Sequence, residues 1–168
     1  AYVRAGYENL PESIWLIRSN GSDNPRMIAE GGYPQWSPDS RCLIYHSHQI
    51  HSVCLLKLND GTPAGKEKLF ELAYGYPRLS PNGEELAFIL PSFVSFYFPS
   101  KNNPTENVML ITNLRKKLLR QHTIPFDAIY TGWSPDGKII AYGGSSKQQG
   151  LYAIDADLES KPVLLVDG

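Results

Sequence analysis

The chain has 168 residues, of which 42% are hydrophobic and 20% are charged, and its formal net charge is −1. This composition is that of a globular domain with a packed core, and the near-zero charge argues against a nucleic-acid or anionic-membrane partner. The longest mainly apolar stretch, 86–98, is interrupted by Pro91 and is shorter than the roughly 20 residues that a membrane-spanning helix needs, so we expect no membrane insertion.

Residues 1–30 predict three short strands. Apolar segments stand around Tyr2, at 14–17 and at 26–28, with polar residues between them. They correspond to the last three strands of each copy of a pattern that recurs further along the chain. The sequence is therefore expected to begin inside a structural repeat, whose first copy lacks its inner strand.

Residues 31–73 predict four strands joined by tight turns. Residues 33–39 read Tyr-Pro-Gln-Trp-Ser-Pro-Asp, and apolar segments follow at 43–45, 53–56 and 68–70. Proline fixes φ at the first central position of a turn, and Asp or Asn tolerates the left-handed conformations that a tight hairpin needs. Ser-Pro-Asp is therefore expected to turn the first strand into the second.

The same pattern returns at 74–123 and at 124–168. Residues 76–83 read Tyr-Pro-Arg-Leu-Ser-Pro-Asn-Gly, and residues 130–137 read Tyr-Thr-Gly-Trp-Ser-Pro-Asp-Gly. The copy at 74–123 also contains an insertion at 91–104. No segment has a sustained 3.6-residue periodicity with helix caps, so we expect an all-β protein of four-stranded antiparallel sheets.

Four-stranded units of about 40 to 45 residues are typical of β-propeller blades. Residues 133–137 (Trp-Ser-Pro-Asp-Gly), followed by Ile-Ala-Tyr at 140–142 and Leu-Tyr-Ala-Ile-Asp at 151–155, resemble the TolB-like propeller repeat. That repeat also occurs in Tricorn-like proteins and in the propellers of prolyl-oligopeptidase-type peptidases. The other copies depart from the motif at Leu79, Asn82 and Ser40, in place of Trp, Asp and Gly.

The resemblance covers nearly the whole chain and implies a β-propeller of about four repeats, at 1–30, 31–73, 74–123 and 124–168. These would form a single propeller domain, or a fragment of one, over 1–168. In such a fold the Trp-Ser-Pro strand lines the central channel. The loops before the first strand and between the second and third strands share one face, where we look for function.

Tyr33, Tyr76 and Tyr130 each stand three positions before the inner-strand Trp, Leu or Trp. Propeller geometry would place them around one mouth of the channel, where they could hold a peptide or an aromatic ligand. The alternative is that each tyrosine packs between adjacent blades, with its hydroxyl bonded to a backbone group.

His46, His48 and His51 crowd the loop between the second and third strands of 31–73. The spacing of His46 and His48 would put both imidazoles on one side of a strand, as a metal site needs. No acidic residue lies nearby in sequence, and a solvated polar turn explains the three histidines better than a metal site does, so we predict no metal and no cofactor and keep these histidines as candidate partner-binding residues. Some oligogalacturonate lyases resemble this propeller and hold a metal with histidines, which keeps that alternative open.

Four aromatic residues stand within six positions of the insertion: Phe93, Phe96, Tyr97 and Phe98. An exposed apolar patch of this kind usually marks an interaction surface, so partner contact or self-association is one interpretation. The alternative is that the insertion buries these rings on its own propeller or simply extends the hairpin.

The sequence contains no Gly-x-Ser-x-Gly elbow and none of the α/β organisation that such an elbow requires. We therefore predict a non-catalytic scaffold that binds a protein or peptide. The alternative is an accessory propeller within a larger peptidase or a metal-dependent oligosaccharide lyase. Because the edges of an open propeller invite association, we expect self-association or further blades from a longer chain. The compartment stays open.

Overall fold

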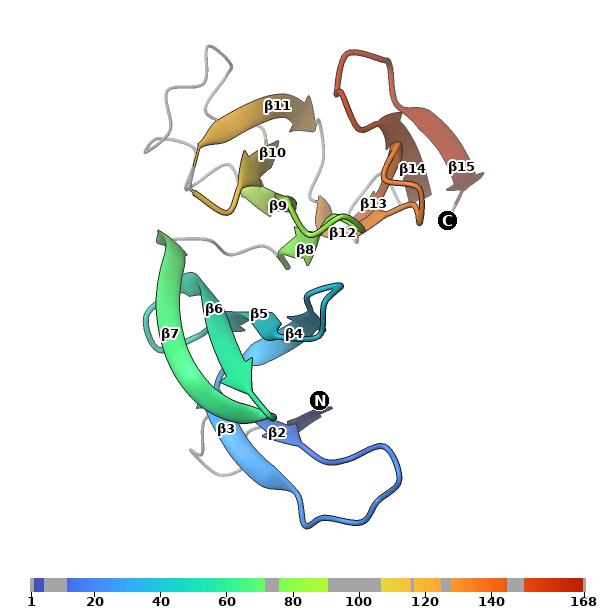
Figure 1. Cartoon of the computed structure of the whole chain (residues 1–168). Coiled ribbons are helices and arrows are strands. Elements are labelled where there is room, and N and C mark those ends of the chain that lie inside the picture. Colours follow the sequence, from blue (N-terminus) through green and yellow to red (C-terminus); the bar gives the residue numbers. More distant parts are fainter. Residues whose placement is uncertain are drawn as a thin grey trace. The chain divides into compact units, whose positions relative to one another are not determined.

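The computed structural model describes residues 2–4, 12–71, 76–90, 107–115, 117–124, 128–144 and 150–167. These residues form fifteen β-strands and no α-helix, which confirms the all-β prediction; accordingly, this part of the chain holds no helix that could span a membrane. The chain divides into two compact units, unit 1 over residues 1–72 and unit 2 over residues 73–168. Figure 1 shows the strands of each unit.

Unit 1 consists of two antiparallel sheets. The first has three strands in the order β1-β2-β3, and the second has four in the order β4-β5-β6-β7. Each strand pairs with the next one along the chain, so both sheets are meanders. The strands are β1 (Tyr2–Arg4), β2 (Ser13–Leu16), β3 (Arg26–Glu30), β4 (Gly32–Trp36), β5 (Cys42–Ser47), β6 (Ser52–Asn59) and β7 (Thr62–Glu71).

Unit 2 consists of two four-stranded antiparallel sheets, with the orders β8-β9-β10-β11 and β12-β13-β14-β15. The prediction of three strands in the first sheet and four in each later sheet is thus confirmed. The strands are β8 (Arg78–Leu79), β9 (Glu85–Leu90), β10 (Asn107–Asn113), β11 (Leu118–Ile124), β12 (Ala128–Trp133), β13 (Ile139–Gly144), β14 (Gly150–Asp155) and β15 (Val163–Asp167).

The first turn of each four-stranded sheet has the same hydrogen-bond pattern. Between β4 and β5, the Ser37 hydroxyl donates to Asp39 Oδ1 at 2.6 Å and accepts from the Cys42 amide at 2.9 Å. One serine hydroxyl therefore bonds both to the side chain within the turn and to the backbone of the strand that follows it. The same two bonds are made by Ser80 with Asn82 and Glu85, and by Ser134 with Asp136 and Ile139.

These turns differ at the residue that takes the left-handed conformation. Gly83 and Gly137 have φ of 77° and 72°, whereas the β4–β5 turn places Ser40 at 59°. A residue with a Cβ is disfavoured there. The hydrogen bond from Ser37 lowers the pKa of Asp39 below its ordinary value, and the bond from Ser134 lowers the pKa of Asp136 in the same way.

The core of unit 1 lies between its two sheets, because alternate side chains of each strand face the neighbouring sheet. Cys54 belongs to this core and is fully buried, whereas Cys42 is half-buried; both are free thiols. The core residues are Ile14, Leu16, Leu43, Tyr45, Cys54 and Leu56.

Unit 2 has a corresponding core between its two sheets. Apart from Leu158 in the turn after β14, its members come from β9, β10 and β11 on one side and from β12, β13 and β14 on the other, so each sheet presents one apolar face to its neighbour. Trp133 and Tyr152 pack against this core while partly buried. The buried members are Ala87, Ile89, Met109, Ile111, Ile124, Ala128, Ile140, Tyr142, Ile154 and Leu158.

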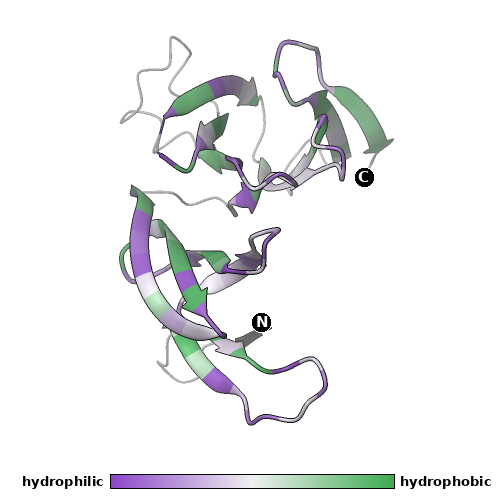
Figure 2. Ribbon diagram, viewed as in Figure 1, coloured by the Kyte–Doolittle hydropathy of each residue, from purple (hydrophilic) through white to green (hydrophobic). Residues whose placement is uncertain are grey.

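The outermost strands of the two units differ in chemistry. In β7 the exposed stretch includes Lys66, Glu67 and Lys68, which is the usual composition of an edge strand. In β15 the four residues 163–166 are all apolar and all exposed. Figure 2 shows the contrast, since β15 is coloured as hydrophobic and most of β7 as hydrophilic or neutral.

Candidate binding surfaces

One end of the two sheets of unit 1 brings together predicted site residues. Gly32 at the start of β4 pairs with His46 at the end of β5, and the amide of Gly31 donates to the Glu12 carbonyl at 2.8 Å. The residue before β2 therefore lies next to the end of β5. His48 stands in the turn that follows β5.

Glu12, His46 and His48 form a connected polar cluster at this end. His48 Nε2 lies 2.8 Å from Glu12 Oε2, and His46 Nδ1 lies 3.2 Å from His48 Nδ1. When His48 donates its Nε2 proton to the carboxylate, its Nδ1 is left to accept from Nδ1–H of a neutral His46. His46 is buried, whereas the side chains of His48 and Glu12 are 43% and 35% exposed, so solvent reaches only part of the cluster.

Tyr33 extends this cluster with an aromatic ring. Its ring centroid lies 6.1 Å from that of His48, with the two planes at 74°, in an edge-to-face contact. Tyr33 has a φ of 57°, which is uncommon for a residue other than glycine and sets the direction in which its side chain leaves β4. We call Glu12, Tyr33, His46 and His48 the Tyr33–Glu12 surface.

Gly32 is required for the close approach of the imidazole and the carboxylate. A Cβ at this position would lie 2.4 Å from Glu12 Oε2 and 3.1 Å from His48 Nε2. Because Gly32 has no Cβ, the His48 imidazole and the Glu12 carboxylate can lie directly against its backbone.

Glu12 was missed in the sequence, where no acidic residue stands near the histidines. It lies 36 positions from His48, and only the packing of one sheet on the next brings them together. Within the described ranges, no group of three or more His, Cys, Asp or Glu side chains is arranged to hold a metal ion. His51 is exposed in the turn before β6 and takes a positive φ of 45°.

In unit 2, Tyr76 and Tyr130 form a stacked pair. Their ring centroids are 4.8 Å apart and the planes differ by 13°. Tyr76 precedes β8 and Tyr130 belongs to β12, so the pair joins neighbouring sheets, and Tyr130 remains 53% exposed. The charge that Tyr76 can carry, together with its hydrogen bond, raises the pKa of the Tyr130 hydroxyl.

The aromatic residues of the insertion, Phe93, Phe96, Tyr97 and Phe98, lie outside the described residues.

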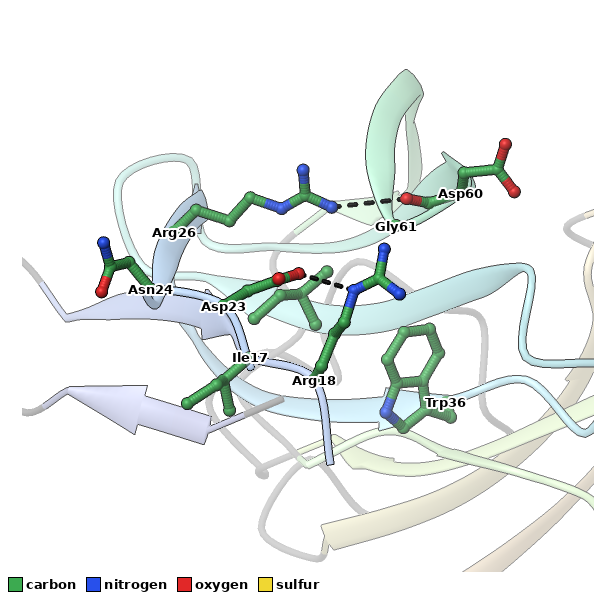
Figure 3. A pocket seen from close by; sticks show the side chains of 9 residues that line it. Ile17, Arg18, Asp23, Asn24, Arg26, Trp36, Asp60 and Gly61 are labelled. Carbon is green, nitrogen blue, oxygen red and sulfur yellow. Dashed lines mark hydrogen bonds and ion pairs between the residues drawn. The ribbon is translucent and has the colours of Figure 1, made fainter. Parts of the chain in front are cut away.

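A hollow of about 750 Å³ opens at the opposite end of the unit 1 sheets and was not foreseen from the sequence. It lies between the segment that follows β2 and the turn between β6 and β7 (Figure 3). Its walls include Leu16–Arg18, Arg26, Trp36 and the Asp60–Gly61 turn. These segments are distant in sequence, and only the register of the sheets places them at one end.

Three solved structures illustrate what this chain is similar to, and each is given with its TM-score, its sequence identity and the share of the two chains that the match covers. TolB from Acinetobacter baumannii has a TM-score of 0.65 at 18% identity, over 92% of this chain and 37% of its own. The β-propeller domain of the Trilobed protease from Pyrococcus furiosus has 0.59 at 11%, over 98% and 52%. An oligogalacturonate lyase in complex with manganese has 0.64 at 14%, over 94% and 46%. No protein-family model and no curated protein matches the chain.

The fold is that of β-propeller blades. The chain spans about half or less of the length of each of these three structures. Likeness at these identities concerns the fold alone, because one propeller architecture serves unrelated functions.

Proposed function

We propose that this chain is a non-catalytic propeller scaffold that binds a protein or peptide through the end of its sheets where the Tyr33–Glu12 surface lies. The observation that carries the proposal is the 2.8 Å contact between His48 and Glu12, which holds partly exposed polar groups beside an aromatic ring. A peptide backbone offers both donors and acceptors, and aromatic side chains contribute much of the energy of protein interfaces.

The stacked tyrosines of unit 2 support the same proposal. Tyr130 lies in the first strand of its sheet, β12, as Tyr33 lies in β4, and it keeps half of its surface exposed. An exposed, rigidly stacked ring loses little conformational entropy when a partner binds.

Selection from a displayed random-peptide library against the purified chain tests this function. We expect enriched peptides whose binding falls about tenfold in Tyr33→Ala and in His48→Ala, as for residues of an interface hot spot. Lys57→Ala, an exposed change elsewhere in unit 1, serves as the control and should bind as the parent chain does. The absence of any enriched peptide, or equal binding by all four proteins, would refute the proposal.

The aromatic segment 93–98 remains a predicted second contact. A variant with Phe96→Ser and Phe98→Ser should recover fewer of the same peptides than the parent chain. Equal recovery by both proteins would remove this segment from the binding surface.

Assembly forms part of the proposal. The exposed apolar residues 163–166 of β15 support either self-association or further blades from a longer chain around a propeller axis. Sedimentation of the purified chain tests this directly. A monomer whose mass does not change with concentration would count against both arrangements.

A second candidate is an accessory propeller within a larger peptidase or lyase. Two observations favour it. A protease and a lyase are among the solved structures with a similar fold, and this chain covers only about half of the length of each. A parent reading frame that encodes a serine-hydrolase domain, or metal found in the purified protein by elemental analysis, would support it over the first.

A further inference from the structure

We propose that the Tyr33–Glu12 surface holds a basic side chain of its peptide partner at the Glu12 carboxylate and releases it when His48 takes up a proton. This inference rests on the proposed function, since it assumes a peptide partner. It adds the chemistry of one contact with that partner and the control of this contact by pH.

The ion pair of Glu12 differs in kind from the others. Among the ion pairs of the described residues, three join a carboxylate to a Lys or Arg side chain: Arg18–Asp23, Lys68–Glu71 and Arg120–Glu85. Glu12 instead pairs with His48, with 2.8 Å between Oε2 and Nε2. Lys and Arg stay charged near neutral pH, whereas an imidazole changes its charge between about pH 5 and 8. Of these four pairs, that of Glu12 is therefore the one whose net charge changes over this range.

A neutral His48 leaves the pair with the negative charge of Glu12. The imidazole donates one hydrogen bond to Oε2, and a carboxylate can accept further bonds, because its two oxygens have about four lone-pair sites. The Glu12 side chain is 35% exposed, so a ligand can reach it. A Lys or Arg side chain supplies both a positive charge and N–H donors for such a carboxylate.

The contact between the two imidazoles determines where an added proton goes. His46 Nδ1 and His48 Nδ1 lie 3.2 Å apart, and their hydrogen bond needs one hydrogen, because one nitrogen must accept. A second hydrogen between them breaks this bond unless His46 moves its own hydrogen to Nε2. His46 is 6% exposed and the His48 side chain is 43% exposed, so water solvates the added charge better on His48. The proton therefore neutralises the pair at Glu12.

Other groups around His48 leave this response to pH in place. The Tyr33 ring of β4 contacts the imidazole edge to face, and a phenol is neutral in the pH range in which histidine titrates. Gln49 follows His48 in the turn and donates to a carboxylate oxygen of Glu30 in β3, which adds negative charge on the same side. His51 is exposed in the same turn. Within the described residues, the titrating group that contacts the Glu12 side chain is thus His48.

The test uses the full chain labelled with ¹⁵N and two probes, acetyl-Ala-Ala-Arg-Ala-Ala-amide and its counterpart with neutral citrulline in place of Arg. The chain has four histidines, and the His48→Gln variant assigns the imidazole signals of His48. At about pH 7.5 we expect the Arg peptide to shift these signals and to bind about fivefold more tightly than the citrulline peptide, as a partly exposed ion pair predicts. At about pH 5.5 the two peptides should bind equally.

Matched variants separate the roles of the carboxylate and the imidazole. Glu12→Gln should abolish the preference for Arg at both pH values, whereas Glu84→Gln in unit 2 should retain it. His48→Gln keeps a neutral N–H donor beside Glu12 and should make the preference independent of pH. The same substitution at His122 in unit 2 should leave the pH dependence of the parent chain unchanged.

Equal binding of the two peptides at about pH 7.5, an unmoved His48 signal, or an unchanged preference in Glu12→Gln would overturn the inference. A preference that the parent chain keeps at about pH 5.5 would overturn the release by His48. Library peptides whose binding falls in Tyr33→Ala and His48→Ala, together with equal binding of the Arg and citrulline peptides, would leave the proposed function standing and remove this inference alone.

Discussion

The two units use the same motif tryptophan in different ways. Trp133 ends β12 and bonds to the backbone of Arg78 in β8, so it joins the two sheets of unit 2. Trp36 ends β4 in unit 1, where the described strands of the neighbouring sheet include no counterpart of β8, and its ring faces a hollow. Within the described residues, the two motif tryptophans therefore differ in their surroundings, since Trp133 is bonded to the neighbouring sheet and Trp36 is 38% exposed.

The sheets of unit 1 are instead connected at the opposite end. There the amide of Gly31 donates to the carbonyl of Glu12, and the side chain of Glu12 contacts His48. Both junctions contain an apolar core; beside it, the junction of unit 1 has backbone and polar contacts, and that of unit 2 has the indole bond of Trp133. Four predictions test this contrast.

The largest difference is expected between the two tryptophans. Trp133→Ala should lower the free energy of unfolding by about 3 kcal/mol, because it removes packed apolar area and leaves a carbonyl without its donor. Trp36→Ala should cost less than about 1 kcal/mol, since its ring lies at the surface. Urea denaturation of both variants measures the two values, and similar losses would show that Trp36 is also structural.

A smaller loss is expected at the junction of unit 1. Gly31 has φ of 141°, and a Cβ there would lie 2.3 Å from the His46 carbonyl oxygen. Gly31→Ala should therefore lower the free energy of unfolding by about 2 kcal/mol. Gly132 is the matched control in unit 2, because an added Cβ meets no atom within 4 Å. If the urea midpoints of the two variants fell together, steric contact at Gly31 could not be the cause.

A gain is expected at the β4–β5 turn. Ser40 has the left-handed conformation that Gly83 and Gly137 adopt in the other two turns. Ser40→Gly should raise the free energy of unfolding by about 0.5 kcal/mol, because relief of the Cβ strain exceeds the added entropy of the unfolded chain. Thermal denaturation should show a higher Tm, and a lower Tm would mean that the serine side chain stabilises the turn.

The smallest effect is expected with pH. The folded pKa values of Asp39 and Asp136 lie below the ordinary value of 3.8, so their turns are stabilised fully above that pH and lose this stabilisation as pH falls through the folded pKa. In a double variant with Asp39→Asn and Asp136→Asn, Tm should therefore fall less steeply than in the parent chain as the pH is lowered from about 5 to about 2.

The turn between β8 and β9 contains Asn82 in the corresponding place and provides the natural comparison. An Asn82→Asp variant should become more sensitive to acid than the parent chain. Parallel Tm profiles for all three proteins would mean that these carboxylates do not contribute to the pH dependence.

The turns could be predicted from the sequence because their causes are local. Ser134 bonds to Asp136 and Ile139, all within six residues, and the alternation of apolar residues defines the strands on either side. The all-β class and the four-stranded sheets follow from the same local signals. Strand limits differ by a few residues, as in β6, which extends over Ser52–Asn59 beyond the predicted segment 53–56.

The surfaces could not be predicted in the same way because they depend on contacts between sheets. Glu12 approaches His48 only through the pairing and packing of two sheets, and no sequence pattern signals that carboxylate. The hollow combines Arg26 with a turn that begins 34 positions later at Asp60. The motif identified Trp36 as an inner-strand residue but did not reveal that it would remain exposed.

The placement of the thiols has a practical consequence for measuring local opening. Both cysteines belong to unit 1, and Cys54 is fully buried while Cys42 is half-buried; desolvation raises the pKa of each thiol and slows its reaction. A thiol reagent should therefore modify Cys42 first and reach Cys54 only when the β4–β7 sheet separates from its neighbour. The rate at which Cys54 is modified therefore measures how often the sheets of unit 1 separate, and unit 2, which has no cysteine, does not contribute to it.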